Sequence, residues 1–167
     1  MTATIPTRCA PRAFGHAFTL VEILIVVVIL GVLAAIVIPQ FTSAAEDSRK
    51  TVFATNLREF VKGIRLYNLE TDLLVADGGS GLVPPGLDPY VDVNKWLAGT
   101  PIGGVWDAES NDLGGFPQAV GVHFNGIGMT RDDAFMTEID AILDDGDLTT
   151  GVFRKIAGDR YYFIIDE

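Results

Sequence analysis

The sequence is poor in the side chains on which most metal sites and many enzymes depend. Its 167 residues include one cysteine, Cys9, and two histidines, His16 and His123. A single cysteine excludes an intramolecular disulfide and a cysteine-based zinc cluster. Basic residues are also scarce, since 12 Lys and Arg stand against 22 Asp and Glu and the net charge is −10. We therefore expect no nucleic acid partner, because its phosphates would be repelled.

Recognised catalytic patterns are absent from the sequence as well. None of the 18 glycines belongs to a G-x-x-x-x-G-K-[ST] or G-x-G-x-x-G motif, so no phosphate-binding loop is predicted. A Ser–His–Asp triad would need His123, which lies in an apolar strand pattern and is better interpreted as a packed or edge histidine. The sequence thus predicts no catalytic residues and a protein that is not an enzyme.

One long apolar segment makes the mean hydropathy positive, +0.32, in spite of the acidic charge. Residues 18–38 read FTLVEILIVVVILGVLAAIVI, and Glu22 is their only ionisable side chain. A helix of this length is roughly 30 Å long, which matches the hydrocarbon core of a bilayer. We therefore predict a membrane-spanning helix. Glu22 is either a tolerated charge near the membrane edge or a charge held for a cationic partner.

The residues before this segment predict its orientation. Residues 1–17 contain Arg8 and Arg12 and no acid, whereas the chain after Ile38 is acidic. The positive-inside rule then places the N-terminus in the cytoplasm and the C-terminal part across the membrane. The alternative is a secretory signal peptide with a small-residue cleavage site at residues 43–45. The length of the apolar run and its internal carboxylate argue against that alternative.

The start of the apolar segment carries a family resemblance. Residues 15–22 read GHAFTLVE, and the apolar run that follows contains Gly31 and ends at Pro39. This pattern resembles the N-terminal segment of type IV pilins and of type II secretion pseudopilins. In that family, prepilin peptidase removes a short basic leader in the cytoplasm, directly before an FTLVE-type sequence. The new N-terminal phenylalanine is then N-methylated.

The resemblance implies cleavage between Ala17 and Phe18 and N-methylation of Phe18. Glu22 would then be the fifth mature residue, the carboxylate that engages the N-terminal amine of a neighbouring subunit during assembly. Pro39 matches the helix-interrupting proline of the family. Ala17 is a departure, because the family usually has glycine before the cut. Cleavage after Gly15 instead would put a leucine in fifth place, so we prefer the Ala17–Phe18 bond.

Beyond the membrane segment the helical pattern resumes and predicts one helix of about 50 residues. A bend is expected at Pro39, because proline lacks an N–H and clashes with the carbonyl of Ala35. The apolar stripe of the second half is expected to pack on a soluble domain; it comprises Phe53, Leu57, Phe60, Val61 and Ile64. The opposite face is charged and comprises Glu46, Asp47, Arg49, Lys50, Arg58, Glu59 and Lys62.

The rest of the chain predicts loops, short helices and strands. Glycine and proline clusters predict a loop over residues 70–90. Residues 100–107 are expected to form a structured loop whose Trp106 packs on the sheet. Thr130 is expected to cap a helix over residues 131–143. Further elements are a helical turn at 95–97, a strand at 119–124, and a hairpin of strands 152–156 and 160–165. The fold class is α+β and pilin-like, with the long N-terminal helix packed on a small antiparallel sheet.

An acidic cluster is the one candidate metal site in the sequence. Asp140 and Asp144 share a helix face, and Asp145 and Asp147 follow in the turn, at the helix end where negative charge is unfavourable. Hard oxygen ligands suit Ca²⁺, although the spacing is not that of an EF-hand loop. The two interpretations are a calcium site and a solvated turn in which Gly146 supplies a positive φ.

These observations predict a structural subunit of a type IV pilus-like filament or of a type II secretion pseudopilus. Its expected parts are a cytoplasmic leader (1–17), a transmembrane and filament-core helix (18–38) and a periplasmic or extracellular head (39–167). Expected partners are copies of itself or other pilins, prepilin peptidase, the inner-membrane assembly platform and membrane lipid, with no cofactor besides the calcium considered above. The alternative function is a monomeric periplasmic binding domain, either anchored or released.

Overall fold

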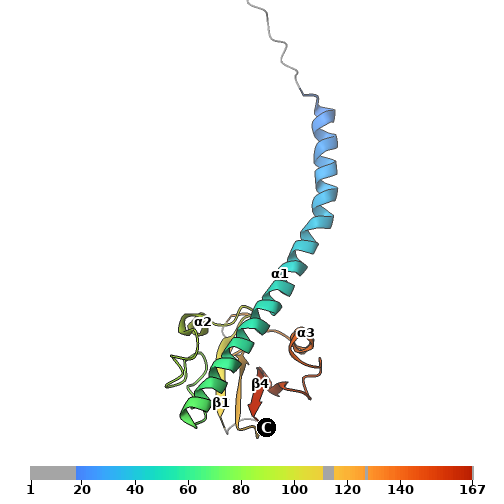
Figure 1. Cartoon of the computed structure of the whole chain (residues 1–167). Coiled ribbons are helices and arrows are strands. Elements are labelled where there is room, and N and C mark those ends of the chain that lie inside the picture. The colour runs from blue at the N-terminus through green and yellow to red at the C-terminus, as the bar shows by residue number, and fades with distance from the viewer. Residues whose placement is uncertain (1–17, 111–114, 127, 167) are drawn as a thin grey trace, which may run out of the picture. The chain divides into compact units, whose positions relative to one another are not determined.

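The structure, a computed structural model, describes residues 18–110, 115–126 and 128–166 (Figure 1). The chain divides into two compact units, Met1–Thr42 and Ser43–Glu167. We call the second unit the head. Helix α1 (Leu20–Thr71) begins in the first unit and continues into the head. The predicted leader, residues 1–17 with Ala17, lies outside the described residues.

Helix α1 confirms the single long helix expected from the sequence. It has 52 residues and runs through Pro39 without ending. The hydroxyl of Thr42 donates a hydrogen bond to the carbonyl oxygen of Ile38 at 3.3 Å, just after the proline. The bend expected at Pro39 remains a prediction.

The second half of α1 supplies the core of the head. All five residues of the predicted stripe are buried: Phe53, Leu57, Phe60, Val61 and Ile64. Lys50, which the sequence placed on the charged face, is instead buried at 7% exposure. Its ammonium group bonds Glu138 of α3 and lies 4.9 Å from the ring centre of Phe135. The expectation failed because a lysine stem can pack on apolar surface while its charge is paired.

The head contains a four-stranded antiparallel sheet, which confirms the α+β fold class. Its strands are β1 (Val105–Ser110), β2 (Gln118–His123), β3 (Phe153–Ala157) and β4 (Arg160–Asp166), in the order β1-β2-β4-β3. The predicted hairpin of β3 and β4 is confirmed. The prediction of a loop over residues 100–107 was wrong for residues 105–107, which belong to β1. The four central residues of β1 alternate between apolar and polar, but their burial does not alternate, because all four are buried, including Asp107 and Glu109.

Aromatic side chains join α1 to the sheet. Trp106 of β1 is fully buried, as expected, and its ring stacks on Phe53 with centroids 5.1 Å apart. Phe60 packs edge-on against Trp106, with ring centroids 4.8 Å apart. The same ring packs at a tilt against Trp96, with centroids 4.9 Å apart. Large aromatic pairs in these geometries add to the free energy of simple burial. The second half of α1 is therefore an integral part of the head's core.

Helices α2 (Val93–Leu97) and α3 (Asp133–Leu143) lie on either side of α1 in the head (Figure 1). Helix α2 confirms the predicted helical turn. Helix α3 begins two residues later than expected, and its cap is Asp132 rather than Thr130, because the Asp132 carboxylate accepts the N–H of Phe135 at 2.9 Å. Arg131 is outside the helix, and its guanidinium pairs with Glu46 at 2.8 Å.

Both outer strands of the sheet are partly covered by the chain's own loops. At β1, the N–H of Gly81 donates to the carbonyl oxygen of Trp106 at 2.8 Å. At β3, the N–H of Lys155 donates to the carbonyl oxygen of Leu148 at 2.9 Å. These bonds tie the loops that follow α1 and α3 to the sheet.

Gly63 allows the loop before α2 to touch α1. A Cβ atom at Gly63 would collide with the carbonyl oxygen of Tyr90 and lie 2.9 Å from a methyl group of Val91. We expect Gly63→Ala to lower the free energy of unfolding of the head by about 2 kcal/mol, because a backbone carbonyl cannot move aside without loss of packing. Thermal unfolding of the purified chain in detergent measures this loss. Gly31→Ala, in the same helix with nothing within 4 Å, should leave the transition unchanged.

Candidate functional site

The N-terminal end of α1 is built by a capping box. Thr19 accepts the N–H of Glu22 on its hydroxyl oxygen at 3.2 Å, and the Glu22 carboxylate accepts the Thr19 N–H and hydroxyl at 2.8 Å each. The Thr-x-x-Glu pattern produces this pair because each side chain satisfies a backbone or side-chain donor of the other at a helix start. Sequence reasoning missed this local role of Glu22, although the pattern was visible. Phe18, which precedes it, is 79% exposed.

The apolar first part of α1 has no cover within the single chain. None of the side chains from Leu20 to Thr42 is buried, and most large apolar ones are about half exposed, such as Ile29 at 54%. This is the one helix among the described residues that is long and apolar enough to cross a membrane. A signal sequence near an N-terminus has the same length and composition. An apolar helix of this kind needs lipid or other protein around it.

The structure brings three of the four predicted acidic residues together. Carboxylate oxygens of Asp140, Asp144 and Asp145 lie within 4.8 Å of one another. Asp140 lies near the end of α3 and is fully buried, whereas the other two are exposed. Gly146 has a φ of 81°, as the sequence predicted for this turn. The helix end thus places a buried carboxylate beneath two exposed ones.

Hydrogen bonds within the turn hold the exposed carboxylates in place. Asp144 accepts the N–H of Val152, and Asp145 accepts the N–H of Asp147 at 2.9 Å. Asp147 is not part of the three-residue group, and its carboxylate accepts the N–H and hydroxyl of Thr149 at 3.0 and 2.6 Å. Asp145 also accepts the hydroxyl of Thr150 at 2.8 Å. Each of these carboxylates keeps acceptor capacity for a further ligand, because a carboxylate has about four lone-pair sites.

Asp140 has the most strongly shifted pKa of these acids. Burial, and secondarily the charges of Asp145 and Asp144, raise its pKa from 3.8 to about 6. Neither carboxylate oxygen has a hydrogen-bond partner among the described residues, although the backbone N–H groups of Asp147 and Gly146 hold down part of the rise. A buried carboxylate without a partner is costly. Either a proton or a cation would lower that cost.

A second polar cluster surrounds His123 at the end of β2. Its Nδ1 lies 2.6 Å from the hydroxyl of Ser80, and its Nε2 lies 3.3 Å from the carboxylate of Asp159. Ser80 also donates to Asp107 at 2.8 Å, and the Tyr162 hydroxyl donates to the same oxygen at 2.7 Å. Burial raises the pKa of Tyr162. The cluster fastens the loop after α1 to the sheet and agrees with a packed histidine.

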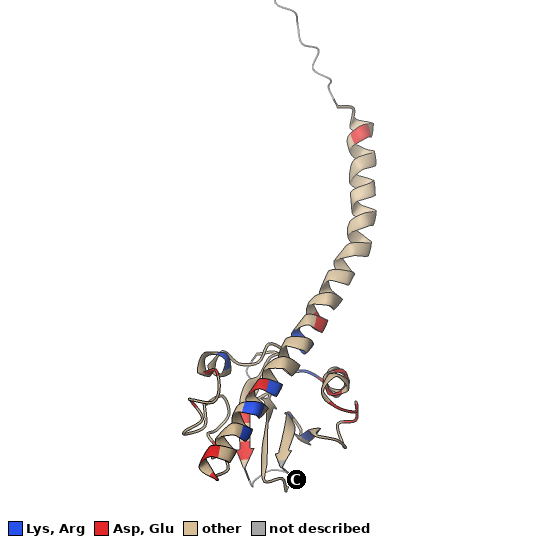
Figure 2. Ribbon diagram, in the orientation of Figure 1, with Lys and Arg blue, Asp and Glu red and all other residues tan. Residues whose placement is uncertain are grey.

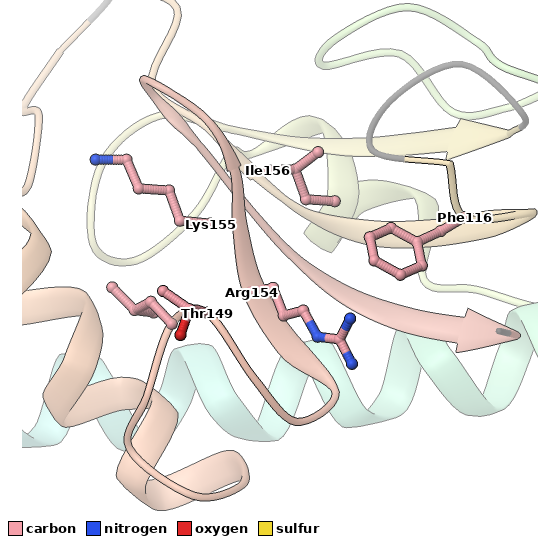
Figure 3. Close-up of a pocket in the computed structure, with 6 residues that line it drawn as sticks. Phe116, Thr149, Arg154, Lys155 and Ile156 are labelled. Carbon is pink, nitrogen blue, oxygen red and sulfur yellow. The ribbon is translucent and has the colours of Figure 1, made fainter.

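One open pocket of about 290 Å³ lies beside β3. Its lining comprises Phe116, Leu148, Thr149, Arg154, Lys155 and Ile156. Figure 3 shows Arg154 directed toward Phe116, with Lys155 on the other side of the strand. The guanidinium lies 5.1 Å from the centre of the Phe116 ring, while Lys155 pairs with Asp133 of α3 at 2.6 Å. The lining contains no carboxylate, histidine or thiol for acid–base or nucleophilic chemistry.

Comparisons with known proteins agree with the N-terminal geometry. The family model described as the prokaryotic N-terminal methylation motif matches residues 15–38. The chain is 42% identical over 59 residues to type II secretion system core protein G of Pseudomonas aeruginosa, which is 35% of this chain and 42% of that protein. It is 39% identical over 66 residues to the type IV major pilin protein PilA of Myxococcus xanthus, 40% of this chain and 29% of that protein.

A third relative is the type IV wide pilus major component PilA4 of Thermus thermophilus. It is 34% identical over 58 residues, which is 35% of this chain and 44% of that protein. The matched part thus spans less than half the length of each of these relatives. No solved structure matches the chain.

The long apolar helix, its capped glutamate and the four-stranded antiparallel head define a pilin-like protein. With the methylation motif over residues 15–38 and the relatives above, the chain is similar in its N-terminal part to the family of type IV pilins and type II secretion pseudopilins. Members of this family are structural subunits and not enzymes.

The raised pKa of Asp140 gives the head a distinct pH dependence. Without divalent cations, the folded state binds a proton at Asp140 below about pH 6, whereas the unfolded state does so only near 3.8. We therefore expect the contribution of Asp140 to the free energy of unfolding to rise by about 2 kcal/mol from pH 7 to pH 4.5. Asp140→Asn should remove most of this rise, as measured by urea unfolding in EDTA. An unchanged slope in the variant would show that Asp140 is not the titrating group.

Proposed function

We propose that the chain is a filament subunit of a type IV pilus or type II secretion pseudopilus. The observation that carries this proposal is the first part of α1, where the apolar side chains have no cover within the chain and a capped glutamate stands at the start. In the precursor, lipid would cover this segment, which suits an inner-membrane anchor with the head on the periplasmic side. In the filament, other copies of the helix would replace lipid.

Cleavage between Ala17 and Phe18 by prepilin peptidase, with N-methylation of Phe18, would place a positive amine close to the capping box. The Glu22 carboxylate already accepts two donors from Thr19 in the single chain. A carboxylate has about four lone-pair sites, so it can accept a neighbouring subunit's amine as well. In an apolar surrounding, an uncompensated carboxylate is costly. Only a copy at the correct axial position would remove that cost, so the pair would set the register between subunits.

The assembly proposal predicts a separation between membrane insertion and polymer formation. Glu22→Ala should leave the protein in the membrane fraction and abolish filaments sheared from cells, because the register-setting carboxylate is lost. Mass spectrometry of the membrane-extracted protein should find N-methylated Phe18 as the first residue of the unsubstituted chain. An uncleaved chain that forms no filaments would instead support a plain anchor on a monomeric head, whereas a variant that still polymerises would show that Glu22 does not set the register.

We also propose that the acidic group of Asp140, Asp144 and Asp145 binds a calcium ion. The supporting observation is the fully buried Asp140 carboxylate, which has no hydrogen-bond partner among the described residues and contributes an oxygen to the group. Three carboxylates are hard oxygen ligands of the type that Ca²⁺ prefers, and backbone carbonyls or waters can complete its 6–8 ligands. The ion would also offset the negative charge at the C-terminal end of α3.

Calcium should therefore stabilise the head. At a hundredfold excess over its Kd, binding raises the free energy of unfolding by about 3 kcal/mol. Thermal unfolding of the chain in detergent, first in EDTA and then with Ca²⁺ or Mg²⁺, measures the change. Asp140→Asn should abolish the calcium effect, while Asp88→Asn, an exposed acid outside the group, should retain it. Equal transitions with and without calcium would leave the solvated turn as the explanation.

A further inference from the structure

Three cations of α1 stand out because they lack acidic partners in a chain with excess acid. Six other described cations lie within 4.0 Å of a carboxylate: Arg49, Lys50, Lys95, Arg131, Lys155 and Arg160. Arg58, Lys62 and Arg65 are exposed and have no such pair among the residues that the structure covers. Their spacing of four and three residues aligns them along one side of the helix. We call these three residues the basic row.

The side of α1 that carries the basic row faces α3. The guanidinium of Arg58 donates to the carbonyl oxygen of Ile142, near the end of α3, at 2.6 Å. Lys62 and Arg65 have no hydrogen bond within the described ranges. Figure 2 shows a run of blue positions along this second half of α1, while other blue positions lie on α2, beside α3 and on the sheet. Holding like charges one turn apart is unfavourable unless something offsets them.

An acidic surface lies on the other side of α1. The segment from Glu70 to Asp92, which we call the acidic loop, contains no Lys or Arg. Its carboxylates are Glu70, Asp72, Asp77, Asp88 and Asp92. Asp72 and Asp88 have no partner in the described structure, while Asp77 and Asp92 accept only backbone N–H groups. Excess negative charge is therefore exposed here, with little internal compensation.

Contacts with α1 place the acidic loop on the α2 side. Tyr90 packs edge-on against Tyr67, with ring centroids 5.5 Å apart, and its hydroxyl donates to Glu70 at 2.8 Å. Lys95, directly after the loop, pairs with Glu59 at 2.6 Å. Because α2 and α3 flank α1 (Figure 1), the basic row and the acidic loop lie on opposite flanks of the head.

We infer that the basic row of one copy docks on the acidic loop of a neighbouring copy. This inference rests on the proposed polymerisation. Parallel subunits related by rotation about a filament axis meet through two different surfaces, and such a contact repeats along the polymer. Opposite charges on opposite flanks fit this arrangement, because one surface of each copy is always free for the next. The contact supplies orientation of the heads, since exposed charge pairs steer association more than they strengthen it.

Cysteine cross-linking tests the contact in the full chain. Lys62→Cys with Asp88→Cys, in a Cys9→Ser background that leaves no other thiol, is expressed in cells with the assembly machinery and oxidised. Non-reducing gels should show a ladder beyond the dimer, with no ladder from either single variant. Filaments without a ladder, or dimers from Lys62→Cys alone, would overturn the inference while the proposed function stands. If the unsubstituted chain forms no filaments, the proposed function fails and this inference fails with it.

Charge reversal provides an independent readout. Exposed ion pairs change association by a factor of about 1.4 to 5 each, and reversal adds repulsion, so Lys62→Glu with Arg65→Glu should lower the yield of sheared filaments about tenfold. The matched control, Lys62→Arg with Arg65→Lys, keeps both charges and should retain the yield. Adding Asp72→Lys with Asp88→Lys to the reversed chain should restore it. Loss without rescue would show that the row meets a different acidic surface.

Discussion

The apolar first half of α1 needs contacts from outside its own chain to shield it from water, and the division of the molecule into a helix and a head follows from this requirement. The apolar part leaves every side chain from Leu20 to Thr42 unburied, whereas the continuation of the same helix places Phe53, Phe60 and Ile64 in a closed core. The second part of α1 is covered by the head's own sheet. In the proposed function, lipid or other copies of the helix would cover the first part. Since the helix is continuous, insertion and head folding share one element.

Polar groups in the head are arranged around the same helix. Lys50 of α1 pairs with Glu138 of α3, and this pairing raises the pKa of Lys50. Glu46 of α1 pairs with Arg131, just before α3. The buried Asp140 is the contrasting case, because its charge is left without an internal partner. Paired groups hold the fold at neutral pH, while an unpaired one leaves the turn responsive to protons or cations.

The sequence predicts best where one physical signal dominates. The apolar segment and the stripe from Phe53 to Ile64 identified α1, and the glycine and aspartate pattern identified the β3–β4 hairpin. Strand β1 was not predicted, although its residues alternate between apolar and polar from Trp106 to Glu109, because Gly103 and Gly104 directly before it favoured a loop. The burial of Lys50 depends on Glu138 and Phe135 of α3, which are far from it in the sequence. The capping role of Glu22 was instead readable from the Thr-x-x-Glu pattern. Only the structure shows that Asp147 bonds Thr149 and is not part of the three-residue acidic group.

The loops bonded to the outer strands of the sheet limit how readily one head can pair with the sheet of another. Strand β1 offers two buried acids and a carbonyl already bonded to Gly81, and β3 carries Arg154 and Lys155 with its Lys155 N–H bonded to Leu148. Short strands with charges at such positions are poor templates for pairing with another sheet. In the proposed filament, these features would keep neighbouring heads from pairing into one continuous sheet.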